Sequence, residues 1–381
     1  MGRLPQNGLV SIQPASPMRV LHLIKGLGPG GAERLILNQV ATSSNPDIEY
    51  AVAFAIREKD HLVDAISKCG VAVTLLDWSR LVPSLNHAIR SHRPDVVHAH
   101  SPLLAASARL LRASPVHRFA MVTTEHNRWP RHHRMTRLAN RLTAPLDHER
   151  IAVSHDVRES MGPRLAEPTR VIDHGIPLDQ IASAADARER QRHAILGSRH
   201  EDTVAIGIVA NFRPEKDYET FLAAARVALD ASPRLHLIVV GQGPGEGDFR
   251  SKAADIARLH VLGYRADVHE VMSAFDAFTL SSRHEGKPVS LMEAFALGLP
   301  AIATRAGGIP EVITDDENGM LVDVGDHEAL ARSWVQIAED QALRERLSAG
   351  ALASRSRFDA ASATKSIESL YRSVLERNND R

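Results

Sequence analysis

Short apolar segments alternate with segments of helical periodicity along almost the whole chain, and this alternation constrains the fold more than any other feature. The first apolar run, at residues 20–24, precedes a glycine-rich turn, and residues 32–41 then carry apolar side chains at spacings of three and four. Such a unit predicts a strand followed by a helix. Where the unit repeats, the strands form a parallel sheet that helices cover on both faces. The sequence therefore predicts an α/β fold.

The predicted strands form two groups, which a polar segment separates. The first group lies at 20–24, 51–56, 71–76, 95–98, 120–124, 151–153 and 171–172, and the second at 204–209, 235–240, 260–262, 277–280, 301–303 and 319–322. A chain of 381 residues is also long enough for two cores. We therefore predict a disordered tail at 1–17, an N-terminal domain at 18–178, a linker at 179–202, a C-terminal domain at 203–355 and a final helical segment at 356–381.

Charge, hydropathy and cysteine content exclude several classes of protein. Lys plus Arg and Asp plus Glu are both 46, so no basic excess indicates a nucleic-acid partner. The sequence has no apolar stretch of about 18 residues that would predict a transmembrane helix, and residues 1–17 lack the apolar run of a signal peptide. The single cysteine, Cys69, is expected in the core and fits a reducing compartment. We expect a cytoplasmic protein.

The segment 282–298 carries the most specific motif. Pro288 suits the first turn of a helix and Gly298 the position just past its end, so a helix is expected over 288–297. The N–H groups of Val289, Ser290 and Leu291 at its start would form an anion site for a diphosphate. Glu285 precedes the helix and Glu293 lies within it, so the two carboxylates are placed to bracket a ligand. Two glutamates at this spacing are otherwise typical of a solvated helix face.

With its glycine, proline and alanine residues, this segment resembles the retaining glycosyltransferases of family four. The resemblance implies that Glu285 contacts the transferred sugar, that Glu293 contacts the nucleotide ribose, and that Gly286 and the start of the helix bind the donor. It also implies two Rossmann-like doubly wound domains that face each other across a cleft, the arrangement called GT-B. The N-terminal domain would be the acceptor side and the C-terminal domain the donor side, and the helix within 356–381 would pack back on the N-terminal domain. The resemblance covers nearly the whole chain from Met18 and is most specific from 204 to 322.

A second motif, at 209–216, provides two cations. Arg213 and Lys216 follow a predicted strand and would neutralise a diphosphate as charge develops on the leaving group. The family usually has its arginine where Asn211 stands, so Arg213 is offset by two residues. The alternative is that both are ordinary surface cations in a turn.

Two glycine-rich turns are the next candidates. Residues 239–245 resemble the family's turn near the base and ribose, with Gly241 and Gly243 allowing close backbone approach, although a plain turn would also contain them. Residues 28–33 resemble its glycine loop, with Gly30 and Gly31 near the reacting sugar. The overlapping stretch 26–31 also fits the dinucleotide fingerprint. Arg57 stands where a ribose-binding acid would be expected, which disfavours NAD but still permits NADP.

His126, at the end of the strand at 120–124, resembles the family's histidine near the transferred sugar. A lone histidine is more often structural, and His98 and His100 are weaker candidates. No group of histidine, cysteine and acidic residues has a spacing that indicates a metal site.

The segment from Arg128 to Arg141 contains five arginines and no acid. A helical face carrying Arg134, Arg137 and Arg141 would suit a phosphate-bearing lipid acceptor or anionic headgroups at a membrane. A solvated basic face is the alternative.

These features together predict a retaining glycosyltransferase that uses a UDP- or GDP-sugar and a glycan or lipid-linked acceptor, in the synthesis of polysaccharide or cell-envelope glycans. We expect no cofactor and no metal, since Arg213 and Lys216 would replace a divalent ion. We also expect a cytoplasmic location, and peripheral contact at the inner face of the membrane stays open. Two alternatives stay open. One is a sugar-nucleotide epimerase of similar architecture, and the other is a nucleotide-sugar binding protein without turnover.

Overall fold

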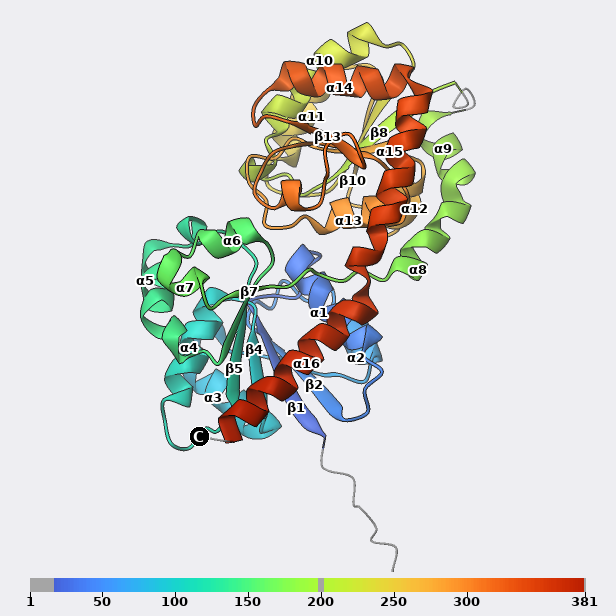
Figure 1. Ribbon diagram of the computed structural model, residues 1–381. Coiled ribbons are helices and arrows are strands. Elements are labelled where there is room, and N and C mark those ends of the chain that lie inside the picture. The colour runs from blue at the N-terminus through green and yellow to red at the C-terminus, as the bar shows by residue number, and fades with distance from the viewer. Residues whose placement is uncertain (1–16, 198–201, 380–381) are drawn as a thin grey trace, which may run out of the picture.

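The computed structural model describes residues 17–197 and 202–379, which form two lobes that each contain one parallel sheet covered by helices (Figure 1). The predicted α/β architecture of two doubly wound sheets is confirmed. Of the tail predicted at 1–17, residues 1–16 lie outside the described residues, as do residues 198–201 of the predicted linker and the last two residues of the chain.

The first sheet has seven strands in the order β3-β2-β1-β4-β5-β6-β7. Their bounds are β1 Met18–Ile24, β2 Ile48–Phe54, β3 Ala72–Leu75, β4 Val96–Ala99, β5 Ala120–Glu125, β6 Glu149–Ala152 and β7 Arg170–Val171. Every neighbouring pair is parallel. The strand order reverses between β1 and β4, and ligands bind at such a switch point beyond the carboxyl ends of the strands.

The second sheet has six strands in the order β10-β9-β8-β11-β12-β13. Their bounds are β8 Val204–Val209, β9 Leu235–Val240, β10 Leu259–Gly263, β11 Ala277–Leu280, β12 Ala301–Thr304 and β13 Gly319–Val322. These strands are also parallel, and the switch point lies between β8 and β11.

Helices cover both faces of each sheet. The first lobe contains α1 Gly31–Thr42, α2 Val63–Lys68, α3 Leu81–His92, α4 Pro102–Arg112, α5 Arg134–Thr143, α6 His155–Glu159 and α7 Pro163–Ala166. The connection contains α8 Leu178–Ala182 and α9 Arg188–Leu196, and the second lobe α10 Tyr218–Ala231, α11 Glu246–Ala253, α12 Val268–Ser273, α13 Val289–Ala296, α14 His327–Glu339 and α15 Gln341–Ser354. Short 3₁₀ turns lie at Trp78–Arg80, Trp129–Arg131, Ala144–Leu146, Ser183–Ala187, Pro214–Lys216, Ile309–Glu311 and Arg355–Phe358. None of the described helices combines the length and the apolar character that crossing a membrane requires.

The last helix, α16 (Ala360–Asn379), leaves the second lobe and packs across the sheet of the first (Figure 1). Leu370, Tyr371 and Val374 are buried with the apolar side chains of β1 and β2. The Tyr371 hydroxyl also bonds Nδ1 of His98 at 2.6 Å and accepts from Gln39 at 3.2 Å. Helix α16 is therefore held on the first lobe by apolar burial and polar contacts together.

The prediction of a buried Cys69 is wrong. The residue follows the end of α2 and is exposed, and its thiol lies 3.4 Å from the Ala65 carbonyl oxygen. Gly70 takes a positive φ of 78° at the same place, so the chain turns into β3 on the outside of the lobe. The apolar pattern of the neighbouring strand does not extend to this turn.

Candidate active site

A cleft of about 890 Å³ runs between the two lobes, and the loops that line it follow the carboxyl ends of strands in both sheets. Eleven of the thirteen predicted site residues line this cleft: Gly30, Gly31, His126, Arg213, Lys216, Gly241, Glu285, Gly286, Val289, Ser290 and Glu293. The topology thus brings together residues that are more than 200 positions apart in the sequence, such as Gly30 and Glu285.

Glu285 and Lys216 form an ion pair with an Nζ to Oε1 distance of 2.6 Å. The Ser282 hydroxyl donates to the same Oε1 at 2.6 Å, and Ser281 donates to the Lys216 carbonyl at 2.8 Å. Both side chains are largely buried, with 9% and 17% of their surface exposed. The loop after β11 and the turn after β8 are therefore fastened to each other at the point where a cation and a carboxylate meet.

A glycine turn after β12 supports the loop that carries Glu285. A Cβ added to Gly307 would lie 1.9 Å from the Glu285 carbonyl oxygen, and one added to Gly308 would lie 1.9 Å from that of Gly286. Gly307 also takes a φ of 54°. No other residue can come so close to this loop, so the turn has a structural role in supporting Glu285.

The N-terminus of α13 opens toward the cleft. The N–H groups of Val289 and Ser290 have no acceptor among the described residues. The prediction for Leu291 is wrong in this respect, because its N–H donates to the Pro288 carbonyl at 3.2 Å and its side chain is buried in the second lobe. Pro288 precedes the helix instead of beginning it, and Gly298 follows it with a φ of 72°.

Glu293 lies in α13 between the side chains of His269 and Arg34. His269 of α12 is 3.0 Å from its Oε1, and Arg34 of α1 is 3.8 Å from the same atom across the cleft. Burial alone would raise the pKa of Glu293, but the hydrogen bond from His269 and the charges of His269 and Arg34 outweigh burial and lower it. The carboxylate therefore stays ionised. The sequence contains no signal that pairs His269 or Arg34 with Glu293.

The two glycines after β9 serve different purposes. Gly241 lines the cleft and has φ 154°. Gly243 is not among the residues that line it, and a Cβ there would lie 2.8 Å from the Phe212 carbonyl oxygen. Gly243 therefore lets the turn pack against the loop after β8, and its contact with the donor stays a prediction.

The lobes touch at two other glycines. A Cβ on Gly31 would lie 3.2 Å from Cγ2 of Val289, and one on Gly286 would lie 2.3 Å from the His126 carbonyl oxygen. Each contact joins a loop of the first lobe to the motif around α13. The absence of side chains here lets the two halves of the cleft approach.

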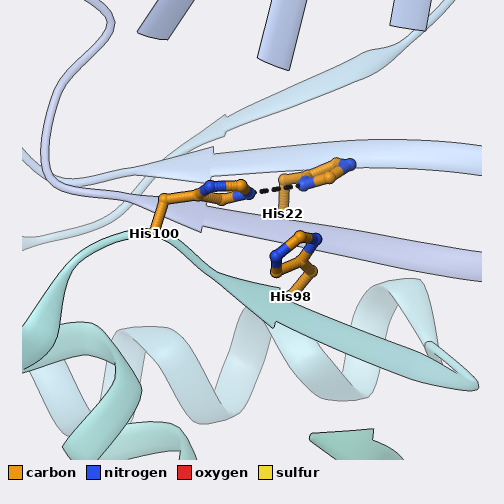
Figure 2. A group of neighbouring side chains, drawn as sticks. All are labelled: His22, His98 and His100. Carbon is orange, nitrogen blue, oxygen red and sulfur yellow. Dashed lines mark hydrogen bonds between the residues drawn. The ribbon is translucent and has the colours of Figure 1, made fainter. Parts of the chain in front are cut away.

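His126 ends a row of histidines at the carboxyl edge of the first sheet. Nε2 of His126 lies 3.1 Å from Nδ1 of His100, and Nε2 of His100 lies 3.0 Å from Nδ1 of His22. Figure 2 shows His22 and His100 joined by this bond, with His98 below them. Ring nitrogens of His22, His98 and His100 lie within 4.8 Å of one another, a proximity that their spacing in the sequence does not reveal. Both nitrogens of His98 already bond hydroxyls, those of Tyr371 and Thr124.

The arginines of segment 128–141 divide into two sets. Arg128 pairs with Asp156 at 3.5 Å and Arg131 with Glu215 at 3.2 Å, and both line the cleft. The other three, Arg134, Arg137 and Arg141, lie on α5, outside the cleft lining.

Comparisons with known proteins agree with this geometry. The family model "Glycosyltransferase Family 4" matches residues 20–180 and the model "Glycosyl transferases group 1" matches residues 190–353. The chain is 26% identical over 313 residues to the putative glycosyltransferase EpsD of Bacillus subtilis, covering 77% of this chain and 80% of that protein. It is 25% identical over 289 residues to the UDP-Gal:alpha-D-GlcNAc-diphosphoundecaprenol alpha-1,3-galactosyltransferase of Escherichia coli, covering 71% and 73%.

Relatives and solved structures extend the match to nearly the full length. The lipopolysaccharide core biosynthesis glycosyltransferase LpsD of Rhizobium meliloti is 24% identical, with 94% of this chain and 98% of that protein covered. The crystal structure of Anabaena Alr3699/HepE in complex with UDP and glucose superposes with a TM-score of 0.81 at 22% identity, covering 93% and 99%. The two family models between them span both lobes of this fold. The chain therefore belongs to the family 4, group 1 glycosyltransferases, and it is a transferase enzyme of the GT-B architecture.

Proposed function

We propose that this glycosyltransferase takes its sugar from a UDP- or GDP-sugar bound at the start of α13. One observation carries the proposal. The Val289 and Ser290 N–H groups, which have no acceptor among the described residues, face a cleft that also holds Lys216 and Arg213. A helix N-terminus and two cations together suit a diphosphate. Glu293 then binds the ribose hydroxyls and Glu285 the sugar.

Donor binding divides the Lys216–Glu285 pair between two partners. Lys216 moves toward the phosphate oxygens, where its charge stabilises the leaving diphosphate, and Glu285 accepts hydrogen bonds from sugar hydroxyls. Retention at the anomeric carbon follows if the leaving phosphate takes the proton of the acceptor on the same face of the sugar. Nuclear magnetic resonance of the product tests retention, because an α-linked donor must give an α-linkage.

A thermal-shift panel tests the donor site. The panel contains UDP, GDP and their common sugars, together with NADP. Each compound is added to wild type, to Glu293→Gln and to the control Glu376→Gln, which alters an exposed glutamate on α16. Binding raises the melting temperature by mass action. We expect one sugar nucleotide to stabilise wild type and Glu376→Gln but not Glu293→Gln. Stabilisation by NADP alone would contradict the proposal.

We propose that the reaction needs no divalent metal, since Lys216 and Arg213 supply the positive charge beside the diphosphate. Treatment with a chelator should therefore leave the rate unchanged. Loss of activity that magnesium or manganese restores would refute this part of the proposal.

The acceptor we propose is a glycan or a lipid-linked glycan. The name of LpsD includes lipopolysaccharide core biosynthesis, and the name of the Escherichia coli relative includes a diphosphoundecaprenol-linked sugar. Polysaccharide or cell-envelope glycan synthesis is the setting that such acceptors imply.

We also propose that α5 brings the enzyme to an anionic membrane. Met135, Leu138 and Leu142 on this helix are 75%, 58% and 72% exposed, beside Arg134 and Arg141. Exposed apolar side chains among cations suit a headgroup interface. Wild type should sediment with vesicles containing phosphatidylglycerol but not with pure phosphatidylcholine vesicles. Leu138→Glu should abolish sedimentation, while Val227→Glu, at an exposed site in the second lobe, should not; equal binding of both variants would refute the proposal.

A further inference from the structure

The row of histidines behind the cleft comes from three different strands of the first sheet. His22 lies within β1, His100 directly follows β4, and His126 directly follows β5. Nδ1 of His22 meets Nε2 of His100 at 3.0 Å, and Nδ1 of His100 meets Nε2 of His126 at 3.1 Å (Figure 2 for the first pair). At both contacts, Nδ1 of one histidine therefore meets Nε2 of the next, in the order His22, His100, His126.

All three rings are neutral near pH 7. Burial lowers the pKa of His22 to about 3 and that of His126 to about 4. The pKa of His100 is also far below its usual value, through burial first and then through the neighbouring histidines. A neutral imidazole has one N–H donor and one acceptor nitrogen. The tautomer of any one member of the row therefore sets the tautomers of the others.

Two arrangements satisfy both contacts. In the first, each ring carries its proton on Nδ1, so that His22 donates to His100 and His100 donates to His126. In the second, each ring carries its proton on Nε2, and the donation runs in the opposite direction. The two arrangements differ at the ends of the row, which are Nε2 of His22 and Nδ1 of His126.

The inner end of the row favours the first arrangement. Nε2 of His22 is buried and has no hydrogen-bond partner among the described residues. The second arrangement would place an N–H at this atom, and a buried N–H without an acceptor is both rare and costly. The first arrangement leaves only an unused lone pair there.

At the outer end, Nδ1 is the nitrogen of His126 that a ligand can reach. His126 lines the cleft, and the bond to His100 occupies its Nε2. Within the described chain no residue bonds Nδ1. The charge state and the direction of the row therefore decide what this atom offers to the sugar.

We propose that His22 and His100 are positioning residues that hold His126 in the Nδ1–H tautomer, so that it faces the cleft as a hydrogen-bond donor. In this form Nδ1 binds an oxygen of the sugar or phosphate and takes no proton from the acceptor. The inference rests on the proposed function, because it deepens the role of His126 beside the transferred sugar.

Long-range ¹H–¹⁵N correlation spectra of ¹⁵N-histidine protein test the tautomer directly, since protonated and unprotonated ring nitrogens have well-separated shifts. His126→Gln identifies the His126 signals. We expect a protonated Nδ1 in wild type and in His100→Asn, whose amide can still donate to Nε2 of His126. In His100→Leu that donor is lost, and the proton should redistribute to Nε2. His98→Gln is the matched control, since His98 shares the cluster but bonds Thr124 and Tyr371.

Turnover measurements complete the test. We expect kcat to fall about tenfold in His100→Leu, the equivalent of one hydrogen bond, and to stay within about threefold of wild type in His100→Asn. A wild-type spectrum with the His126 proton on Nε2, or a charged ring, would overturn the proposal even if His100→Leu does not fold. An unchanged His126 spectrum in folded His100→Leu would also overturn it. If wild type transfers no sugar, the proposed function fails, while the spectra still decide the tautomer.

Discussion

Lys216 and Glu285 lie where the two motifs of the second lobe meet, with 2.6 Å between Nζ and Oε1. Replacement of Lys216 by Met keeps much of the side-chain volume and removes the charge. We expect kcat to fall by about 10² or more, as for loss of a charged group that stabilises a leaving group, with a smaller change in KM.

The control for this variant is Lys252→Met. Lys252 pairs with Glu219 on the surface, where both side chains are substantially exposed, so its loss should leave the rate close to that of wild type. Steady-state kinetics on both variants make the comparison. Equal rates for Lys216→Met and wild type would show that the Lys216 charge is not needed for catalysis.

For single residues, the sequence predicts a site residue well where one short segment contains the whole motif. The spacing of Glu285 and Glu293 relative to the start of a helix can be read directly. The partners of these carboxylates cannot, because His269 and Arg34 reach Glu293 from another helix and from the other lobe. The contacts of Leu291 and Gly243 cannot be read from their motifs either, because the Leu291 N–H bonds the Pro288 carbonyl and Gly243 packs against the Phe212 carbonyl.

Among the helices and strands, α13 offers the clearest test of diphosphate binding at a helix N-terminus. Val289 is the first residue of the helix, and Pro288 before it is extended, with φ −72° and ψ 120°. Val289→Pro therefore fits the backbone and removes one N–H. Val289→Ala trims the same side chain and keeps the N–H. We expect Val289→Pro to bind the nucleoside diphosphate about tenfold more weakly than Val289→Ala, by calorimetric titration. Equal affinities would show that the helix start does not bind the phosphates.

The elements themselves are largely predictable. Within the described parts of the chain, each of the thirteen strands falls within a few residues of its predicted place, since a buried parallel strand is a short apolar run between turns. The predicted bounds are wrong by a few residues at the ends of some strands, because hydrogen bonds of the following turn decide where a strand ends. The exposure of Cys69 is such a case, because Gly70 turns the chain before the apolar run begins.

At the scale of the whole molecule, the approach of the two lobes decides whether the site is complete. Gly286 lies against the His126 carbonyl, and an added Cβ would come within 2.3 Å of that backbone oxygen. Gly286→Ala must therefore displace one lobe against the other. A displacement of about 1 Å can cost about 10² in rate, and we expect kcat/KM to fall by that order while the far-ultraviolet circular dichroism stays unchanged.

Gly247→Ala provides the control, because a Cβ there would meet no atom within 4 Å. Its kcat/KM should match that of wild type. Wild-type kinetics in Gly286→Ala as well would mean that the lobes need not approach as closely as the structure places them.

The relation between the lobes is the part of the molecule that the sequence predicts least. Each lobe follows from its own apolar pattern, whereas the pairs Arg34–Glu293 and Arg131–Glu215 join charges that are distant along the chain. Surface cations and acids are common, and no local signal marks which of them meet. The resemblance to a family implies a cleft between two domains, but it does not say which side chains pair across that cleft.

A crystal structure of the protein with a UDP- or GDP-sugar would locate the donor itself. We expect diphosphate density at the Val289 and Ser290 N–H groups, with Lys216 and Arg213 on the phosphates, the ribose on Glu293 and the sugar beside Glu285 and His126. Diphosphate density at the loop of residues 26–31, away from α13, would instead place the donor site in the first lobe and refute the proposed function.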